Sequence, residues 1–136
     1  MDPEVRAAIE ITPAAGTRER IIDITTTGRR TGRLRRIEIF FHHAAGRTYL
    51  CSGTSGRPTS WYANLLAHPD FTFHLKHGIR ADLPARAAPV TDPEERRCIL
   101  TEIVADLNQA HNPGTITQPT HLRDWLDSRL AHVTFP

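Results

Sequence analysis

Apolar and polar residues alternate with a period of two over much of the chain, which is typical of strands with one buried face. The clearest case is Ile37, Ile39 and Phe41, which alternate with Arg36, Glu38 and Phe40. With turn residues as boundaries, we expect six strands, at about 20–25, 36–43, 48–51, 71–77, 79–90 and 132–135. Because Pro84 and Pro89 have no amide hydrogen for a β-ladder, we expect the fifth strand at an edge of the sheet or with a bulge.

Apolar residues that recur with a period near 3.6 predict one longer helix, at about 93–107. It follows Asp92, a good N-cap residue, and starts with Pro93, which suits the first turn of a helix. Its apolar stripe consists of Ile99, Leu100, Ile103, Val104 and Leu107. Shorter helices are expected near the N-terminus, at about 61–67, and from 120 or 121 to 125.

These elements together predict an α+β fold, a small barrel of about six mainly antiparallel strands with short flanking helices. We expect a single domain over residues 19–136, preceded by an N-terminal extension over residues 1–18. No apolar run approaches the roughly 20 residues that a membrane-spanning helix needs. We therefore expect a cytoplasmic protein without a transmembrane segment.

The charge of the chain is nearly balanced but locally concentrated. The net charge is +2, with sixteen arginines and a single lysine among 136 residues. Nucleic-acid binding normally requires an extended basic face, which this balance does not favour. Cys51 and Cys98 lie far apart and indicate neither a disulfide framework nor a zinc site. His42 and His43 are adjacent in a strand and should face opposite sides, so we expect no metal site.

Arginines concentrate in the turn between the first two predicted strands. Five lie within eight positions: Arg29, Arg30, Arg33, Arg35 and Arg36. Gly28 and Gly32 tolerate positive φ and allow a ligand close to the backbone. The N–H groups of residues 28–32 could form an anion-binding concavity, and guanidiniums bind phosphate and carboxylate bidentately. The turn is therefore either an anion site or a solvated hairpin tip.

Three segments carry a resemblance to a known family. They are Thr-Thr-Thr-Gly-Arg-Arg-Thr-Gly-Arg-Leu-Arg at 25–35, Gly-Arg-x-Tyr-Leu at 46–50 and Trp-Tyr-x-Asn-Leu-x-Ala-His-Pro at 61–69. Over about residues 21–99 the chain resembles the deazaflavin-dependent nitroreductase and F420H2-dependent quinone reductase family, common in actinobacteria. The resemblance implies a split β-barrel that uses reduced F420, a deazaflavin with a phosphate and an oligoglutamate tail. The segment 121–125 departs from the tyrosine-rich pattern of nitroimidazole-reducing relatives.

The resemblance also implies a set of cofactor-binding residues. The arginine-rich turn would hold the phosphate and tail, the loop 52–55 would meet the ring, and the helix at 61–67 would flank it. The expected residues are Thr27, Gly28, Arg29, Arg30, Thr31, Gly32, Arg35, Arg36, Ile37, Glu38, Ser52, Gly53, Thr54, Ser55, Trp61, Tyr62 and Asn64. His121 and Trp125, four apart on one helical face, would line the acceptor pocket. The alternatives are a plain surface loop at 52–55, core packing for Trp61 and Trp125, and helix capping for Asn64.

The function implied is transfer of a hydride from reduced F420 to a small electrophilic acceptor, namely a quinone, an enone or a nitroaromatic. The cofactor carries the chemistry, so no catalytic side chain is assigned and no nucleophile–base pair is expected. FMN is the less favoured cofactor. The alternative is a non-catalytic protein that binds or stores F420, a flavin or haem. A homodimer is compatible with this interpretation, as is peripheral contact with a membrane if the acceptor is a lipid quinone.

Overall fold

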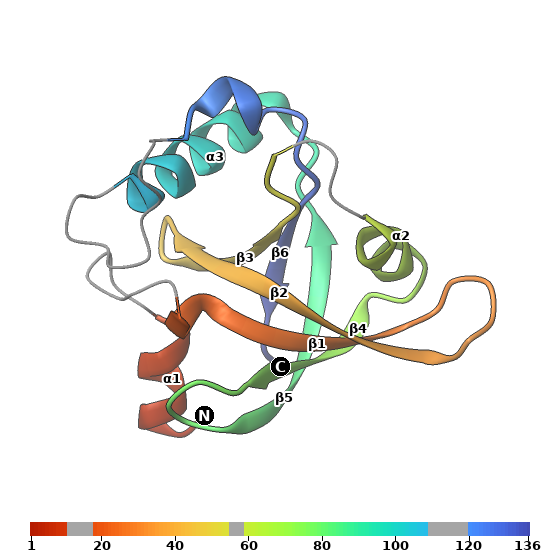
Figure 1. Cartoon of the computed structure of the whole chain (residues 1–136). Coiled ribbons are helices and arrows are strands. Elements are labelled where there is room, and N and C mark those ends of the chain that lie inside the picture. Colours follow the sequence, from red (N-terminus) through yellow and green to blue (C-terminus); the bar gives the residue numbers. More distant parts are fainter. Residues whose placement is uncertain (11–17, 55–58, 109–119) are drawn as a thin grey trace.

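Six antiparallel strands form a closed barrel in the computed structural model, which describes residues 1–10, 18–54, 59–108 and 120–136 (Figure 1). The strands follow the order β1-β2-β3-β6-β5-β4 around the barrel. Their bounds are β1 (Ile21–Thr27), β2 (Leu34–Ala44), β3 (Arg47–Cys51), β4 (Asp70–Leu75), β5 (Ala81–Pro89) and β6 (Leu130–Thr134). The predicted α+β fold with about six antiparallel strands is confirmed.

The barrel interior is filled by the apolar positions of the alternating pattern. Ile22 and Ile24 of β1 are fully buried, as are Phe41 of β2 and Phe73 of β4. The rings of Phe41 and Phe73 meet edge to face with centroids 5.3 Å apart, a favourable aromatic geometry. Each such side chain contributes about 2 kcal/mol by its removal from water. The period of two therefore predicts the core-facing residues of these strands.

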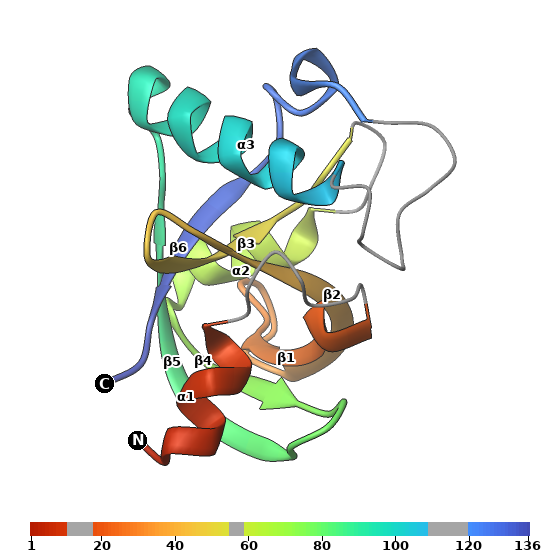
Figure 2. The same cartoon turned by 90° about the vertical axis from the view of Figure 1, so that its left-hand side faces the viewer.

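Helices cover the barrel at two ends and on one side. The helices are α1 (Pro3–Ile9), α2 (Ser60–Ala67) and α3 (Pro93–Leu107), with short 3-10 turns η1 (Arg18–Arg20) and η2 (Leu122–Asp124). Ile9 of α1 is part of the barrel core. The buried face of α3 packs with Tyr49 and Trp125 in a second apolar cluster. Figure 2 shows α1 and α3 on opposite sides of the barrel. No described helix is both long enough and apolar enough to span a membrane.

The expectation that the fifth strand lies at an edge is wrong, because β5 has a neighbour on each side. It pairs with β4 over residues 81–86 and with β6 over residues 86–89. Pro84 lies where only β4 is paired, opposite Thr72, and Pro89 lies where only β6 is paired, opposite Ala131. Each proline thus stands where one side of the strand needs no hydrogen-bond donor. The two prolines therefore mark parts of β5 that pair with one neighbouring strand only, and not an edge strand.

The expected helix at 120–125 is only a 3-10 turn. η2 covers Leu122–Asp124, with His121 and Trp125 as its flanking residues. A 3-10 turn has three residues per turn, so residues four apart do not share its face as they would on an α-helix. The premise that placed His121 and Trp125 together is therefore wrong. The start of α3 is as expected, since the Glu95 N–H donates to Asp92 Oδ2 at 2.9 Å.

Candidate functional site

The arginine-rich turn forms the tip of the β1–β2 hairpin, which extends past α2 and away from the barrel (Figure 1). The Gly28 N–H donates to the Arg33 carbonyl at 2.8 Å, and the Gly32 N–H donates to the Gly28 carbonyl at 2.9 Å. Gly32 has a φ of +72°, in the left-handed region that favours glycine. A Cβ at Gly28 would lie 3.1 Å from the Arg33 carbonyl oxygen, so a side chain there would strain the turn.

Asn64 of α2 anchors this tip to the barrel. Its Oδ1 accepts from the Arg29 N–H at 3.1 Å and from Arg29 Nη1 at 3.3 Å. Its Nδ2 donates to Thr26 Oγ1 at 3.3 Å, and the residue is only 3% exposed. A buried amide with its polar atoms satisfied holds its partners in one arrangement. The side chain thus neither caps the helix nor reaches into open space; it joins α2 to the turn.

The expected concavity of free backbone N–H groups is not present over most of the turn. The N–H groups of Gly28, Arg29 and Gly32 all donate to acceptors within the protein. The anion-binding capacity of the tip therefore lies mainly in its side chains. Arg29, Arg30, Arg33 and Arg35 are all exposed, and none forms an ion pair with any other described residue. Thr27 and Thr31 lie at the same tip.

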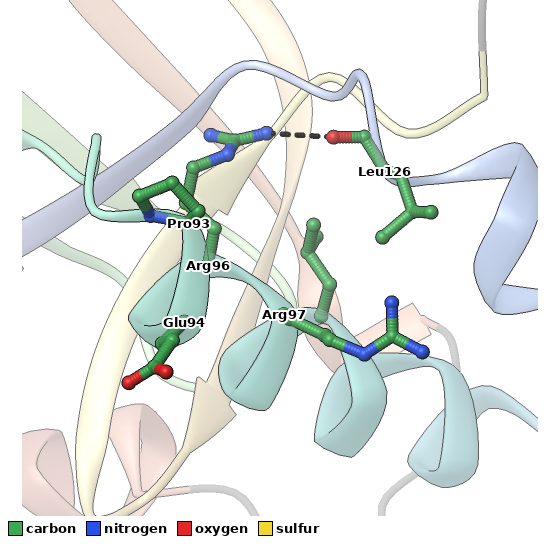
Figure 3. Close-up of a pocket in the computed structure, with 6 residues that line it drawn as sticks. Pro93, Glu94, Arg96, Arg97 and Leu126 are labelled. Carbon is green, nitrogen blue, oxygen red and sulfur yellow. Dashed lines mark hydrogen bonds between the residues drawn. The ribbon is translucent and has the colours of Figure 1, made fainter.

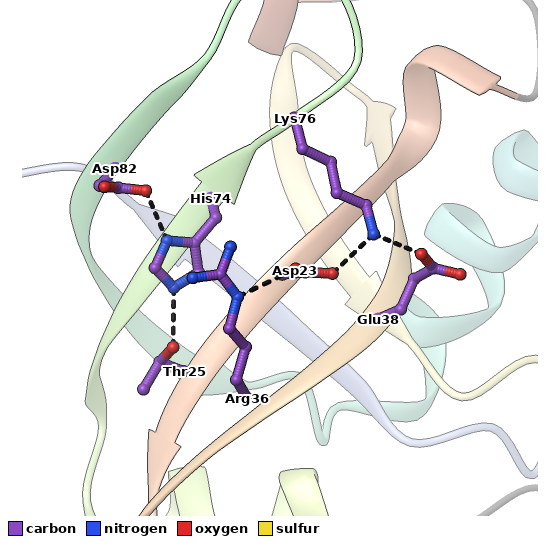
Figure 4. A network of polar contacts seen from close by, with 7 residues as sticks. All are labelled: Asp23, Thr25, Arg36, Glu38, His74, Lys76 and Asp82. Carbon is purple, nitrogen blue, oxygen red and sulfur yellow. Dashed lines mark hydrogen bonds and ion pairs between the residues drawn. The ribbon is translucent and has the colours of Figure 1, made fainter.

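Arg36 and Glu38, which we expected at the cofactor, are engaged elsewhere. Arg36 Nε lies 2.9 Å from Asp23 Oδ2, and Lys76 Nζ lies 2.8 Å from Asp23 Oδ1 and also contacts Glu38 (Figure 4). Although burial opposes the shift, hydrogen bonds from Lys76 and Arg36 hold the pKa of Asp23 below its usual value. Strand alternation explains the difference, because it turns these two charges outward while Ile37 between them packs against the barrel core.

The same outer face carries a Thr25–His74–Asp82 chain of hydrogen bonds (Figure 4). Thr25 Oγ1 lies 2.7 Å from His74 Nε2, and His74 Nδ1 lies 2.6 Å from Asp82 Oδ1. Thr25 and His74 thus lie within the distance of a nucleophile–base pair, although we expected none. However, Thr25 lies where β1 is paired on both sides, with Arg36 and Thr72. The ladders use the nearby N–H groups, so this part of the strand offers no oxyanion hole. We regard these hydrogen bonds as a structural link between strands.

The loop after β3 is tied to the segment before β6. The Ser52 N–H donates to the Arg129 carbonyl at 3.0 Å, and the Arg129 N–H donates to Ser52 Oγ at 2.8 Å. The hydroxyl of buried Ser128 donates to the Gly53 carbonyl. Ser52 and Gly53 are half-buried and Thr54 is exposed, whereas Ser55 lies outside the described residues. The structure therefore adds Ser128 and Arg129 to the candidate site.

The two aromatic residues at the start of α2 have different surroundings. Trp61 is 6% exposed and belongs to the barrel core, as the alternative interpretation predicts. Tyr62 is half-buried, meets the Trp61 ring edge to face at 5.8 Å, and lies under the Arg129 guanidinium, whose carbon is 5.8 Å from the Tyr62 centroid. This is cation–π distance. Sequence reasoning missed Arg129 because no local signal joins residues 77 positions apart.

The two expected acceptor-pocket residues are not brought together. Trp125 is 8% exposed within the cluster under α3, and its indole N–H donates to Thr120 Oγ1 at 2.6 Å. Its ring also meets that of His42 edge to face at 6.2 Å. His121 is exposed. Trp125 thus packs in the core, and the segment it stabilises is the one that leads to Ser128 and Arg129.

A separate pocket of about 350 Å³ lies at the start of α3 (Figure 3). Its lining residues are Pro93, Glu94, Arg96, Arg97, Leu100 and Leu126. Arg96 donates to the carbonyls of Val90 at 3.0 Å, Leu126 at 3.0 Å and Ser128 at 2.5 Å. This arginine therefore holds the C-terminal segment in place. The pocket shares no residue with the hairpin tip or with the loop after β3.

Comparison with known proteins agrees with the barrel fold. A solved structure described as an F420-H2 dependent reductase (FDR-A) is 19% identical, covers 85% of this chain and 94% of its own, and superposes with a TM-score of 0.54. The haem storage protein HutZ of Vibrio cholerae is 12% identical over 99% and 89% of the two chains, with a TM-score of 0.61. A FAD-binding protein of Mesorhizobium loti is 10% identical over 100% and 91%, also with 0.61. At these identities the likeness concerns the fold.

The barrel and its neighbours thus define a split β-barrel protein of the class that includes flavin- and deazaflavin-binding proteins. None of the curated proteins compared with the chain matches it. The sequence profile of the F420H(2)-dependent quinone reductase family matches residues 9–114. The chain belongs to this family.

Proposed function

We propose that this protein binds reduced F420 and catalyses hydride transfer to a small electrophilic acceptor, a quinone, an enone or a nitroaromatic. The observation that carries the proposal is the hairpin tip. Four exposed guanidiniums without ion-pair partners among the described residues project from a turn that a buried asparagine holds against α2. Clustered like charges of this kind repel one another, and a polyanion would relieve that repulsion.

The donor set of the tip fits the cofactor's chemistry. The phosphate and glutamates of F420 form an extended chain of anionic oxygens, and planar guanidiniums bind such oxygens through paired N–H groups. We assign Arg29, Arg30, Arg33 and Arg35 to this role, with Gly28 and Gly32 shaping the turn. Arg36 and Glu38 are left out because their charges already have partners.

The ring end of the site would lie between the loop after β3 and α2. Ser52, Gly53 and Thr54 offer hydroxyl and backbone groups there, and Tyr62 offers a half-buried aromatic face. When bound, reduced F420 supplies the hydride from its C5 atom. The protein's part is to orient the ring and acceptor, to exclude water, and to present donors to the oxygen on which negative charge develops.

Turnover separates an enzyme from a protein that only binds or stores its cofactor. The purified chain is mixed with reduced F420 and a panel of naphthoquinones, enones and nitroaromatics, and the oxidised deazaflavin is followed by its absorbance. We expect acceptor-dependent oxidation faster than in the protein-free control. Tight F420 binding without such oxidation would favour storage, and haem binding in preference to F420 would favour a role like that of HutZ.

A further inference from the structure

Arg129 is held in place far more firmly than its surface position requires. Its carbonyl accepts from the Ser52 N–H at 3.0 Å, next to the last β3–β6 pair, and its N–H donates to the Ser52 hydroxyl oxygen at 2.8 Å. The preceding residue, Ser128, bonds to Gly53 and accepts from Arg96. The main chain at Arg129 therefore has little freedom to move. Its guanidinium carbon then lies 5.8 Å from the centre of the Tyr62 ring.

This cation lies on the opposite flank of α2 from the hairpin tip. Each residue of an α-helix turns the chain by about 100°, so side chains two positions apart point roughly 200° from each other. Asn64 faces β1 and the tip, through Thr26 and Arg29. Tyr62, two positions earlier, faces Arg129. The helix therefore separates two cationic positions, one at the tip and one beside the loop after β3.

The Arg129 side chain is free to bind an anion. It forms no ion pair with any residue in the described part of the chain, and it is exposed. A guanidinium that lies over an aromatic ring still has N–H groups at its edge, because the ring contacts only its face. Two parallel N–H groups match the two oxygens of a carboxylate. The site therefore suits a carboxylate presented from solvent.

We propose that Arg129, supported by Tyr62 and Ser52, is an anion-binding residue that selects hydride acceptors bearing a carboxylate. This inference rests on the proposed function, because it takes the loop after β3 and α2 as the ring end of the site. Carboxylates could come from the acceptor or from the glutamate tail of the cofactor. We assign the acceptor, because the four arginines of the tip lie on the other flank of α2.

The test compares Arg129→Gln and Arg129→Lys with wild type. Arg123→Gln serves as the matched control, since Arg123 is an exposed arginine of the same C-terminal segment, within the turn η2. The probes are a naphthoquinone carrying a carboxylate and its uncharged methyl ester. KM and kcat are measured with reduced F420, and probe affinity is measured without turnover by NMR on the protein with oxidised F420. Titration of F420 itself and a melting curve complete the set.

We expect Arg129→Gln to raise KM and Kd for the carboxylated quinone about tenfold, to leave the ester within twofold, and to leave F420 affinity unchanged. Arg129→Lys should recover part of the loss, and Arg123→Gln should behave as wild type. Equal losses for both quinones, or no loss for either, would overturn the proposal. A fall in F420 affinity would assign Arg129 to the cofactor tail instead. If F420 binds to no variant, the proposed function fails, and NMR of the two probes with the protein alone still decides whether Arg129 distinguishes them.

Discussion

Arg30 and Arg35 are the residues on which the assignment of the hairpin tip can be tested separately from its fold. Both are exposed and neither has an ion-pair partner among the described residues, so their removal should cost little stability. We expect Arg30→Ala with Arg35→Ala to weaken F420 binding about thirtyfold, about 1 kcal/mol for each lost contact. The slope of log Kd against log salt concentration should also decrease, because fewer charges take part.

The matched control is Arg80→Ala with Arg123→Ala, which removes the same charge from two exposed positions away from the tip. Isothermal titration at several salt concentrations measures both pairs. If the two double variants lose the same affinity, the effect is one of overall charge. The tip would then be a solvated hairpin end.

The buried side chain of His42 should make the free energy of unfolding depend on pH. It is 3% exposed, its Nδ1 has no hydrogen-bond partner among the described residues, and burial together with the nearby charge of Arg20 lowers its pKa to about 3. The unfolded chain, with an ordinary histidine pKa near 6.5, binds a proton that the folded chain does not. The free energy of unfolding should therefore fall as the pH drops from about 6.5 towards 3, by on the order of 1 kcal/mol per pH unit from this group.

His42→Gln should make the fall in stability below pH 6.5 shallower, and the measurement is urea denaturation at several pH values. His43 and His132, whose pKa values burial also lowers, remain in both proteins, so the difference isolates His42. Parallel pH profiles for the two proteins would mean that His42 gains a proton in the folded state as easily as in the unfolded one.

At the scale of elements, the docking of α2 against the β1–β2 hairpin is the decisive contact. Asn64→Ala should lower the free energy of unfolding by about 1–3 kcal/mol, because it leaves the Arg29 N–H and the Thr26 hydroxyl without their partner. It should also weaken F420 binding several-fold, since the tip loses its fixed position. Leu66→Ala, on the exposed face of the same helix, is the control and should change neither quantity appreciably. A stable Asn64→Ala variant with unchanged F420 affinity would show that the tip needs no anchor.

Elements with a strong local signal were predictable, and those that depend on their neighbours were not. The alternation in β2 and the cap and stripe of α3 are local, and the structure confirms both. The position of β5 depends on which strands lie beside it, so its prolines were misread as marks of an edge. Arg36 and Glu38 were grouped with the tip because of their sequence position, although strand alternation and the distant Lys76 direct them to another face.

At the scale of the molecule, barrel closure brings together residues that no window of sequence contains. The loop after β3 meets Ser128 and Arg129 only because β3 pairs with β6. The family motifs indicated the tip, the loop and α2, and the resemblance placed His121 and Trp125 at the acceptor, but no local signal indicated Ser128 and Arg129. The same pairing buries Trp125 under α3, where it packs in the core rather than beside the candidate ring site.

The central claim is that the tip binds a long polyanion, and parallel titrations with F420 and FMN test it most directly. F420 and FMN are titrated into the purified protein under identical buffer conditions, at low and at physiological salt. FMN has a phosphate but no glutamate tail, so it can engage fewer of the four guanidiniums. We expect F420 to bind at least about tenfold more tightly than FMN, a difference of roughly 1.4 kcal/mol. This difference in affinity should decrease as the salt concentration rises. FMN binding as tightly as F420, or more tightly, at low salt would contradict the account.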